Sequence, residues 1–266
     1  MANTMTPLRA AKDHTAPSVF RPENLLREAR RQKRLPVQPV PDICVLDPDG
    51  DLVRHLRGTS RATIDPAWPC YHTDLHRFSH AGETYGAIPC AVGAPFAVLI
   101  GEQLFASGCR LLISITSAGQ IIPSGPPPYF VLIDRALRDE GTSHHYLPPS
   151  QFAEAPAHLL APIAAALRDT IPPVVSGAAW TTDAPFRETE AAIEQARGAG
   201  VLAVEMEAAA LYAFAAARQR DVLCFAHVTN QLAQIEGDFE KGEADGAADA
   251  LLILERTAAA WRTITR

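Results

Sequence analysis

The sequence lacks the features of several large classes of protein. Its 266 residues include five cysteines, an odd number without CxxC spacing, which predicts free thiols in place of a disulfide framework or a zinc site. The uncharged stretch Gly86 to Gly101 is too short to span a bilayer, and Met1 to Lys12 has no apolar signal core. A formal charge of −6 and a pI near 5.8 argue against surfaces for nucleic acid or anionic membranes. We therefore expect a cytoplasmic protein that binds neither nucleic acid nor membrane.

The sequence has the composition of a globular protein, with 47% hydrophobic and 20% charged residues. Short apolar runs typical of strands alternate with helical segments from residue 43 onward. This alternation predicts a single-domain α/β fold in three layers (α/β/α), with a central mixed β-sheet. The expected strands cover 43–46, 85–92, 110–116, 130–133, 174–180, 201–204 and 222–228, and the expected helices cover 95–107, 158–168, 188–196, 208–218 and 244–263.

Residues 1–41 form an N-terminal extension in this prediction. Residues 1 to about 20 are polar and aperiodic, which predicts a disordered tail. Asn24 to Leu35 is expected to be a basic helix whose arginines form a solvated face. The prolines of 36–41 then make a linker, and the folded domain covers 42–266.

Two glutamates stand in surroundings that otherwise predict burial. Glu205 and Glu207 follow the apolar run 201–204 and precede an alanine-rich helix. Because they are two residues apart, they share one face of an extended chain, with Met206 opposite. Buried glutamates need partners, since removing a charge from water is costly. Two interpretations are open: the glutamates cap the following helix, or they accept hydrogen bonds from a polyhydroxylated ligand.

The run VEMEAAALYAFA, residues 204–215, closely resembles the ribose-binding segment of the nucleoside phosphorylase family, which comprises purine nucleoside and uridine phosphorylases. In that family the methionine packs on the ribose and the second glutamate accepts hydrogen bonds from the sugar hydroxyls. The resemblance implies these roles for Met206 and Glu207, with Glu205 in support. It covers about residues 42–260, and the sequence is most similar to that of uridine phosphorylase-like members.

Two further segments resemble the phosphate-binding elements of the family. Gly50 and Arg54 match a Gly-Asp-x-x-Arg segment whose glycine amide and arginine hold phosphate, although the pattern alone predicts only a turn. Ser117 takes the place of a hydroxyl residue that contacts phosphate and ribose. Ser114 is a departure, because the family usually has an arginine there as a second phosphate ligand. The resemblance makes Arg77 a candidate to replace it, reaching the phosphate of a neighbouring subunit.

The remaining resemblances concern the ribose and the base. Gly93 lies in a turn that lines the ribose side of the pocket in the family, although Phe96 replaces the small hydroxyl residue found there. Phe186 matches an aromatic residue that stacks on the base, and Arg187 would face the base carbonyls or phosphate. Asn230 stands where many purine enzymes of the superfamily have a general-acid aspartate. Its amide both donates and accepts, which suits uracil or a 6-oxopurine as leaving group better than adenine.

The resemblance thus implies phosphorolysis of a ribonucleoside, with uridine or a 6-oxopurine nucleoside as substrate and the free base and ribose 1-phosphate as products. Glu207, Asn230 and Arg54 are the expected catalytic residues, inorganic phosphate is the co-substrate, and no metal or other cofactor is expected. Two alternatives stay open: an N-ribohydrolase, which Ser114 favours, and a non-catalytic nucleoside-binding module. Family members assemble, so a homodimer or a hexamer built as a trimer of dimers is expected.

Overall fold

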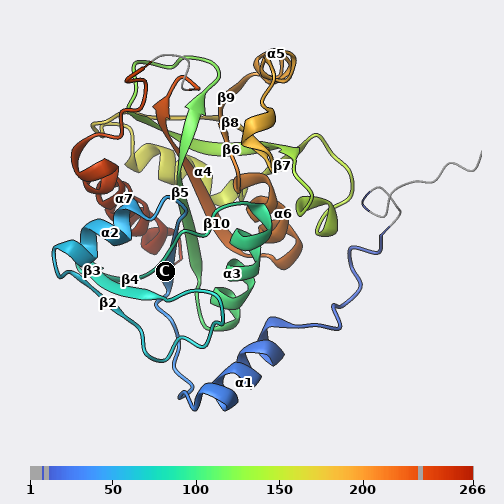
Figure 1. The fold of residues 1–266 in the computed structure, drawn as a ribbon, viewed down its shortest axis with the longest axis vertical. Helices are drawn as coiled ribbons and strands as arrows, with labels where there is room; N and C mark the ends of the chain where they lie inside the picture. Colours follow the sequence, from blue (N-terminus) through green and yellow to red (C-terminus); the bar gives the residue numbers. More distant parts are fainter. Residues whose placement is uncertain (1–7, 9–11, 233–235, 266) are drawn as a thin grey trace, which may run out of the picture.

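The computed structural model describes residues 8, 12–232 and 236–265, where helices cover both faces of a mixed sheet (Figure 1). Within these residues the ten strands follow the order β10-β6-β8-β9-β5-β1-β4-β3-β2, and β7 pairs with β6. Because β10 also pairs with β5, part of the sheet closes into a ring. The strands are β1 (Ile43–Asp47), β2 (Ala62–Ile64), β3 (His76–His80), β4 (Glu83–Pro89), β5 (Leu111–Gln120), β6 (Tyr129–Asp139), β7 (Phe152–Glu154), β8 (Val174–Thr182), β9 (Val201–Glu205) and β10 (Asp221–Asn230). The α-helices are α1 (Pro22–Lys33), α2 (Asp51–Gly58), α3 (Ala94–Ala106), α4 (Ala157–Ala166), α5 (Glu190–Gly198), α6 (Ala208–Arg218) and α7 (Ala247–Ile264).

The central strand β1 is apolar along almost its whole length because both of its faces are buried. It pairs in parallel with β4 and β5 and is buried along its whole length. Cys44 and Leu46 face the core that α3 and α6 share with the sheet, whereas Ile43 and Val45 face the core of α2, α4 and α7. A strand covered on both faces needs apolar side chains at every position. The predicted three-layer α/β fold is therefore confirmed.

Strand β5 departs from the prediction at its carboxyl end. The predicted strand ends at residue 116, but β5 continues to Gln120 and pairs there in antiparallel fashion with β9. Gly119 makes this pairing possible, because a Cβ there would come within 2.4 Å of the Leu232 side chain and 3.2 Å of Val204. This continuation brings Ser117 and the Glu205 segment to the same end of the sheet.

The N-terminal extension is joined to the body. Helix α1 packs against α3, with Leu26 and Ala29 fully buried. Of the predicted tail, residues 1–7 and 9–11 lie outside the described residues. Lys12 and His14 both reach the carbonyl oxygen of His144, at 3.3 Å. Across the described residues, none of the helices has the length and apolar character to cross a membrane.

Candidate active site

Glu205 uses both carboxylate oxygens within the chain. It lies at the end of β9, where Oε2 accepts hydrogen bonds from the amides of Glu207 (2.7 Å) and Ala208 (2.8 Å). Oε1 accepts a hydrogen bond from the hydroxyl of Thr181 on β8. These contacts satisfy amide groups at the start of α6, as in a helix cap. Glu205 thus fixes the direction in which the chain leaves the sheet.

Glu207 keeps one oxygen free. Its Oε1 accepts a hydrogen bond from the amide of Gly93 (2.7 Å), which precedes α3. Its Oε2 has no hydrogen-bond partner among the described residues. Solvent does not replace that partner, because the residue is only 1% exposed. Burial, followed by the nearby charge of Glu205, raises the pKa of Glu207 well above its usual range. An unpaired buried acceptor is costly, and it marks the position where a hydroxyl donor from a ligand would be stabilised.

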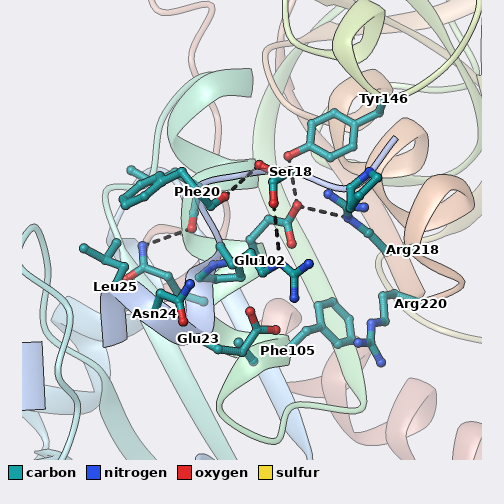
Figure 2. Close-up of a pocket in the computed structure, with 16 residues that line it drawn as sticks. Ser18, Phe20, Glu23, Asn24, Leu25, Glu102, Phe105, Tyr146, Arg218 and Arg220 are labelled. Atoms are coloured by element: carbon teal, nitrogen blue, oxygen red, sulfur yellow. Dashed lines mark hydrogen bonds and ion pairs between the residues drawn. The ribbon is translucent and has the colours of Figure 1, made fainter. Parts of the chain in front are cut away.

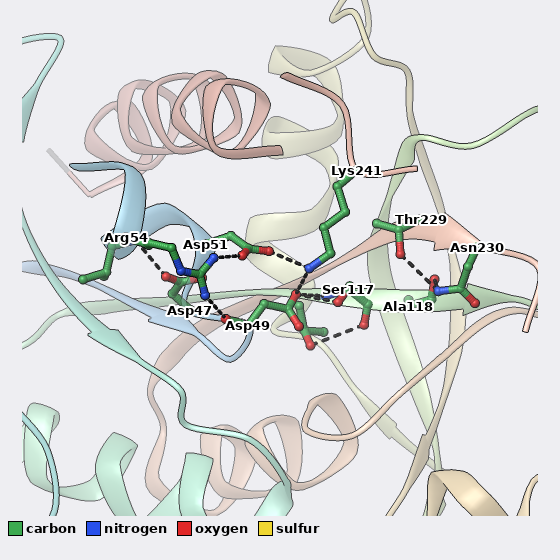
Figure 3. A network of polar contacts seen from close by, with 11 residues as sticks. Asp47, Asp49, Asp51, Arg54, Ser117, Ala118, Thr229, Asn230 and Lys241 are labelled. Atoms are coloured by element: carbon green, nitrogen blue, oxygen red, sulfur yellow. Dashed lines mark hydrogen bonds and ion pairs between the residues drawn. The ribbon is translucent and has the colours of Figure 1, made fainter. Parts of the chain in front are cut away.

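Asp49 and Ser117 form the second half of the site (Figure 3). Asp49 Oδ2 accepts hydrogen bonds from both the amide (2.8 Å) and the hydroxyl (2.5 Å) of Ser117. The Ser117 hydroxyl, which the resemblance assigns to phosphate, therefore binds a carboxylate of the chain itself, as does the Ser117 amide. This part of the site adjoins the glutamates, since β5, which carries Ser117, pairs at Gly119 with Val204 of β9, the residue before Glu205.

The turn before α2 is rich in acidic side chains. The amide of Gly50, predicted to hold phosphate, donates to the carbonyl of Asp47 at 2.9 Å. Arg54 forms an ion pair with Asp51, and its Nη2 donates to the backbone oxygen of Asp49 at 3.4 Å. Burial raises the pKa of Asp47 to about 6. Each predicted phosphate ligand in this turn thus has an internal partner.

Lys241 is a cation at this site that the sequence analysis did not identify. It reaches from the segment before α7, with Nζ 2.6 Å from Asp51 Oδ2 and 3.9 Å from Asp49 Oδ2. Figure 3 shows it opposite Ser117 across these carboxylates. A lysine in a loop, far along the chain from 47–51, gave no sequence signal of this contact.

The carboxyl end of β10 supplies the remaining polar groups. Asn230 Oδ1 accepts a hydrogen bond from the amide of Leu232 (2.9 Å), and its Nδ2 donates to the hydroxyl of Thr229 (3.1 Å). His227 lines the same hollow as Asp49 and Ser117. Its ring stacks on Phe130, with ring centroids 4.3 Å apart. Its buried Nε2 has no hydrogen-bond partner in the described part of the chain. Burial lowers the pKa of His227 to about 4, so a neutral imidazole faces the hollow at neutral pH.

The structure does not bring three predicted residues into this cluster. Phe186 and Arg187 lie in the short 3-10 helix Pro185–Arg187, where the Phe186 side chain is 99% exposed. Arg77 lies on β3 and pairs with Asp65 at 2.6 Å. Met206 is half-buried beside the two glutamates. The described residues thus place the sugar and Ser117 elements together with Asn230, but leave Phe186 and Arg187 apart.

Comparisons with known proteins identify the family of the chain and solved structures with a similar fold. The sequence model of the Phosphorylase superfamily matches residues 42–260. Uridine phosphorylase from Vibrio fischeri ES114 is 20% identical, with 85% of this chain and 93% of that chain covered and a TM-score of 0.69. AMP nucleosidase from Bacteroides thetaiotaomicron VPI-5482 is also 20% identical, with coverages of 85% and 91% and a TM-score of 0.67. These structures share the fold, and the comparison with curated proteins gave no significant match.

Proposed function

The chain belongs to the phosphorylase superfamily, and we propose that it cleaves the N-glycosidic bond of a ribonucleoside with water as the acceptor. The solved structures of similar fold include both a uridine phosphorylase and a nucleosidase. The choice between phosphate and water therefore depends on the residues around Ser117.

The bond between Asp49 and Ser117 is the observation that carries the proposal. Phosphate at Ser117 would need the amide and hydroxyl that Asp49 Oδ2 already takes. It would also lie near the carboxylates of Asp49 and Asp51, and two negative charges about 4 Å apart repel by about 1–4 kcal/mol in water or near a protein surface. Water carries no charge and is not excluded in this way.

In the proposed reaction, Glu207 and Met206 hold the sugar, and Asp49 activates the water. The free Oε2 of Glu207 accepts hydrogen bonds from the ribose hydroxyls, and Met206 packs on the sugar. Asp49 Oδ1, which has no hydrogen bond among the described residues, takes a proton from water as the water oxygen bonds to C1′. The bond from C1′ to the base nitrogen breaks, and the electron pair leaves with the base. The carboxylates stabilise the positive charge that develops on the sugar.

The base side of the proposal rests on the sequence resemblance. Asn230 would bond the departing base, which favours uridine or a 6-oxopurine nucleoside. Phe186 and Arg187 would stack on the base and contact its carbonyls. Because Phe186 is fully exposed, these contacts require the segment 185–187 to move toward the sugar.

Phosphorolysis is the second candidate, and Lys241 is the observation that favours it. Its Nζ lies 3.9 Å from Asp49 Oδ2, so rotation of the Asp49 side chain away from Ser117 would leave a cation beside two hydrogen-bond donors. Arg54 would then be a second cation for phosphate. Phosphate would be the co-substrate in this case, and no other cofactor is proposed.

Initial rates of base release from uridine, inosine, guanosine and adenosine, in phosphate-free buffer and with phosphate added, test the proposal. Equal rates support hydrolysis, and a strict requirement for phosphate supports the second candidate. Nucleoside binding without base release from any of the four would instead indicate a non-catalytic binding module.

We also propose that the chain forms a homodimer or a trimer of dimers. Within one subunit Arg77 bonds Asp65 and the carbonyl of Pro39, away from Ser117. A role for Arg77 therefore requires contact with the site of a neighbouring subunit. A fully active monomer in light scattering would rule out that role.

A further inference from the structure

A cavity of about 570 Å³ lies between the N-terminal extension and the body, apart from the site described above (Figure 2). Residues 17–25 form one wall, and the second half of α3 with residues 218–220 forms the other. This volume lies in the range of small-molecule sites. The wall from the extension lies outside residues 42–260, which match the superfamily. The cavity is therefore built partly from residues outside the superfamily match.

Two arginines at this cavity have no carboxylate partner in the described residues. The Arg220 guanidinium lies 5.3 Å from the centre of the Phe105 ring and makes no ion pair there. Arg21 bonds only the backbone oxygen of Ser18, at 3.4 Å. Arg218 differs, because Glu102 accepts a hydrogen bond from its Nε at 3.3 Å. Glu23 also lines the cavity without an ion pair in the described residues, so two unpaired arginines face one unpaired carboxylate, and this balance favours an anion.

A buried acceptor in the same cavity also lacks a partner. Gln103 is 1% exposed, and its Nε2 donates to the carbonyl of Leu99 at 3.0 Å. Its Oε1 has no hydrogen bond among the described residues. Leaving a buried acceptor unpaired is costly. A ligand that donates an N–H group would remove this cost.

We propose that this cavity binds a purine nucleoside monophosphate. Its phosphate would pair with Arg220 and Arg21, and its ring would lie against the apolar surface of Leu99 and Phe105. An N–H group of the base would donate to Gln103 Oε1 once the Gln103 side chain rotates toward the cavity, because this oxygen is closed off from solvent in the structure. The phosphate thus matches the two cations, the aromatic ring matches the apolar wall, and the N–H donor matches the free acceptor.

The two helices of the cavity connect it to the ribose site. Gly93, which precedes α3, donates its amide to Glu207, and α6 begins directly after Glu207. The helices pack closely at Gly101, where a Cβ would lie 3.6 Å from the Phe214 ring. Because they line the cavity at their other ends, the ligand there changes the affinity of the ribose site for nucleoside.

Calorimetry with the carbocyclic analogue of GMP tests this site, because the analogue has no glycosidic bond to cleave. We expect one molecule bound per cavity and a loss of affinity of at least about tenfold in both Arg220→Ala and Gln103→Leu. Arg168→Ala, at an exposed arginine elsewhere, serves as the matched control and keeps full affinity. Glu207→Ala also keeps the affinity of the cavity, because the substitution weakens only the binding of the analogue at the ribose site.

Two results would overturn the proposal: no detectable binding, or binding that survives Arg220→Ala but is lost in Glu207→Ala. The second result would place the ligand in the ribose site. The kinetic readout is the effect of the analogue on the KM for nucleoside, which should be larger in the wild type than in Arg220→Ala, since competition at the ribose site affects both proteins alike. The binding measurement needs no turnover, so it stands whether water or phosphate is the acceptor.

Discussion

Asp49 and Ser117 are 68 residues apart in the sequence, yet a single carboxylate oxygen of Asp49 binds both the amide and the hydroxyl of Ser117. The two residues come together because β1 pairs in parallel with β5, with Leu46 level with Ser114. The turn after β1 thereby reaches the carboxyl end of β5. A negative side chain thus occupies the position where an anionic co-substrate was predicted.

Replacing Asp49 tests its proposed role as the base that activates water. Asp49→Ala removes this base and frees both donors of Ser117, so hydrolysis should slow by about a hundredfold or more. The residual base release should become faster when phosphate is added. Steady-state rates with and without phosphate measure both effects.

Asp245→Asn is the matched control for Asp49→Ala. Asp245 lines the same hollow, so its substitution removes a nearby negative charge without touching Ser117. We expect near wild-type rates that stay independent of phosphate. Equal losses in the two variants would show that Asp49 acts only through its charge.

Glu207→Gln should lower kcat/KM for the nucleoside at least about a hundredfold, as the loss of a charged contact worth about 3 kcal/mol implies. The ionised form of Glu207 binds the ribose hydroxyls, and burial with the charge of Glu205 raises its pKa. The kcat/KM of the wild type should therefore rise with pH as this proton is lost. The variant should lack that rise, while Glu194→Gln on exposed α5 keeps it. Near-normal turnover by Glu207→Gln would remove the ribose assignment.

Glu205→Ala should mainly affect stability. The substitution leaves the amides of Glu207 and Ala208 without their buried partner, at a cost of about 3 kcal/mol or more. Denaturant unfolding measures the change in free energy. Thr189→Ala is the control, because it removes the cap of the exposed helix α5 and should cost about 1 kcal/mol. Unchanged stability in Glu205→Ala would contradict the capping role.

Asn230→Asp should shift substrate preference toward adenosine. Adenine leaves best when its ring is protonated, and an aspartate can supply an acid that an amide cannot. We expect the ratio of adenosine to uridine kcat/KM to rise by about tenfold or more. Adenosine as the best substrate of the wild type would contradict the role given to Asn230.

The sequence predicted the parts of this protein that depend on local pattern. The strands and helices around Glu205 and Glu207 have clear apolar periodicity, and the motif there identified the glutamates as a pair. Helix α2 and strands β2 and β3 were not predicted, because they are short and have many exposed or half-buried positions. Tertiary packing determines such elements more than their own sequence does.

The charge balance of the site could not be predicted in the same way. Gly50, Arg54 and Ser117 were identified, but the pattern could not show that Asp49 binds Ser117 or that Lys241 pairs with Asp51. These contacts join segments that meet only in the folded sheet. This difference is the reason for proposing water as the acceptor in place of phosphate.

The most direct test of the central claim is the identity of the sugar product formed in ¹⁸O-labelled water with phosphate in excess. Complete conversion of the best nucleoside substrate, followed by NMR and mass spectrometry of the sugar, gives the result. Our account predicts free ribose with ¹⁸O on C1′ and no ribose 1-phosphate. Ribose 1-phosphate as the main product, without ¹⁸O on C1′, would contradict it.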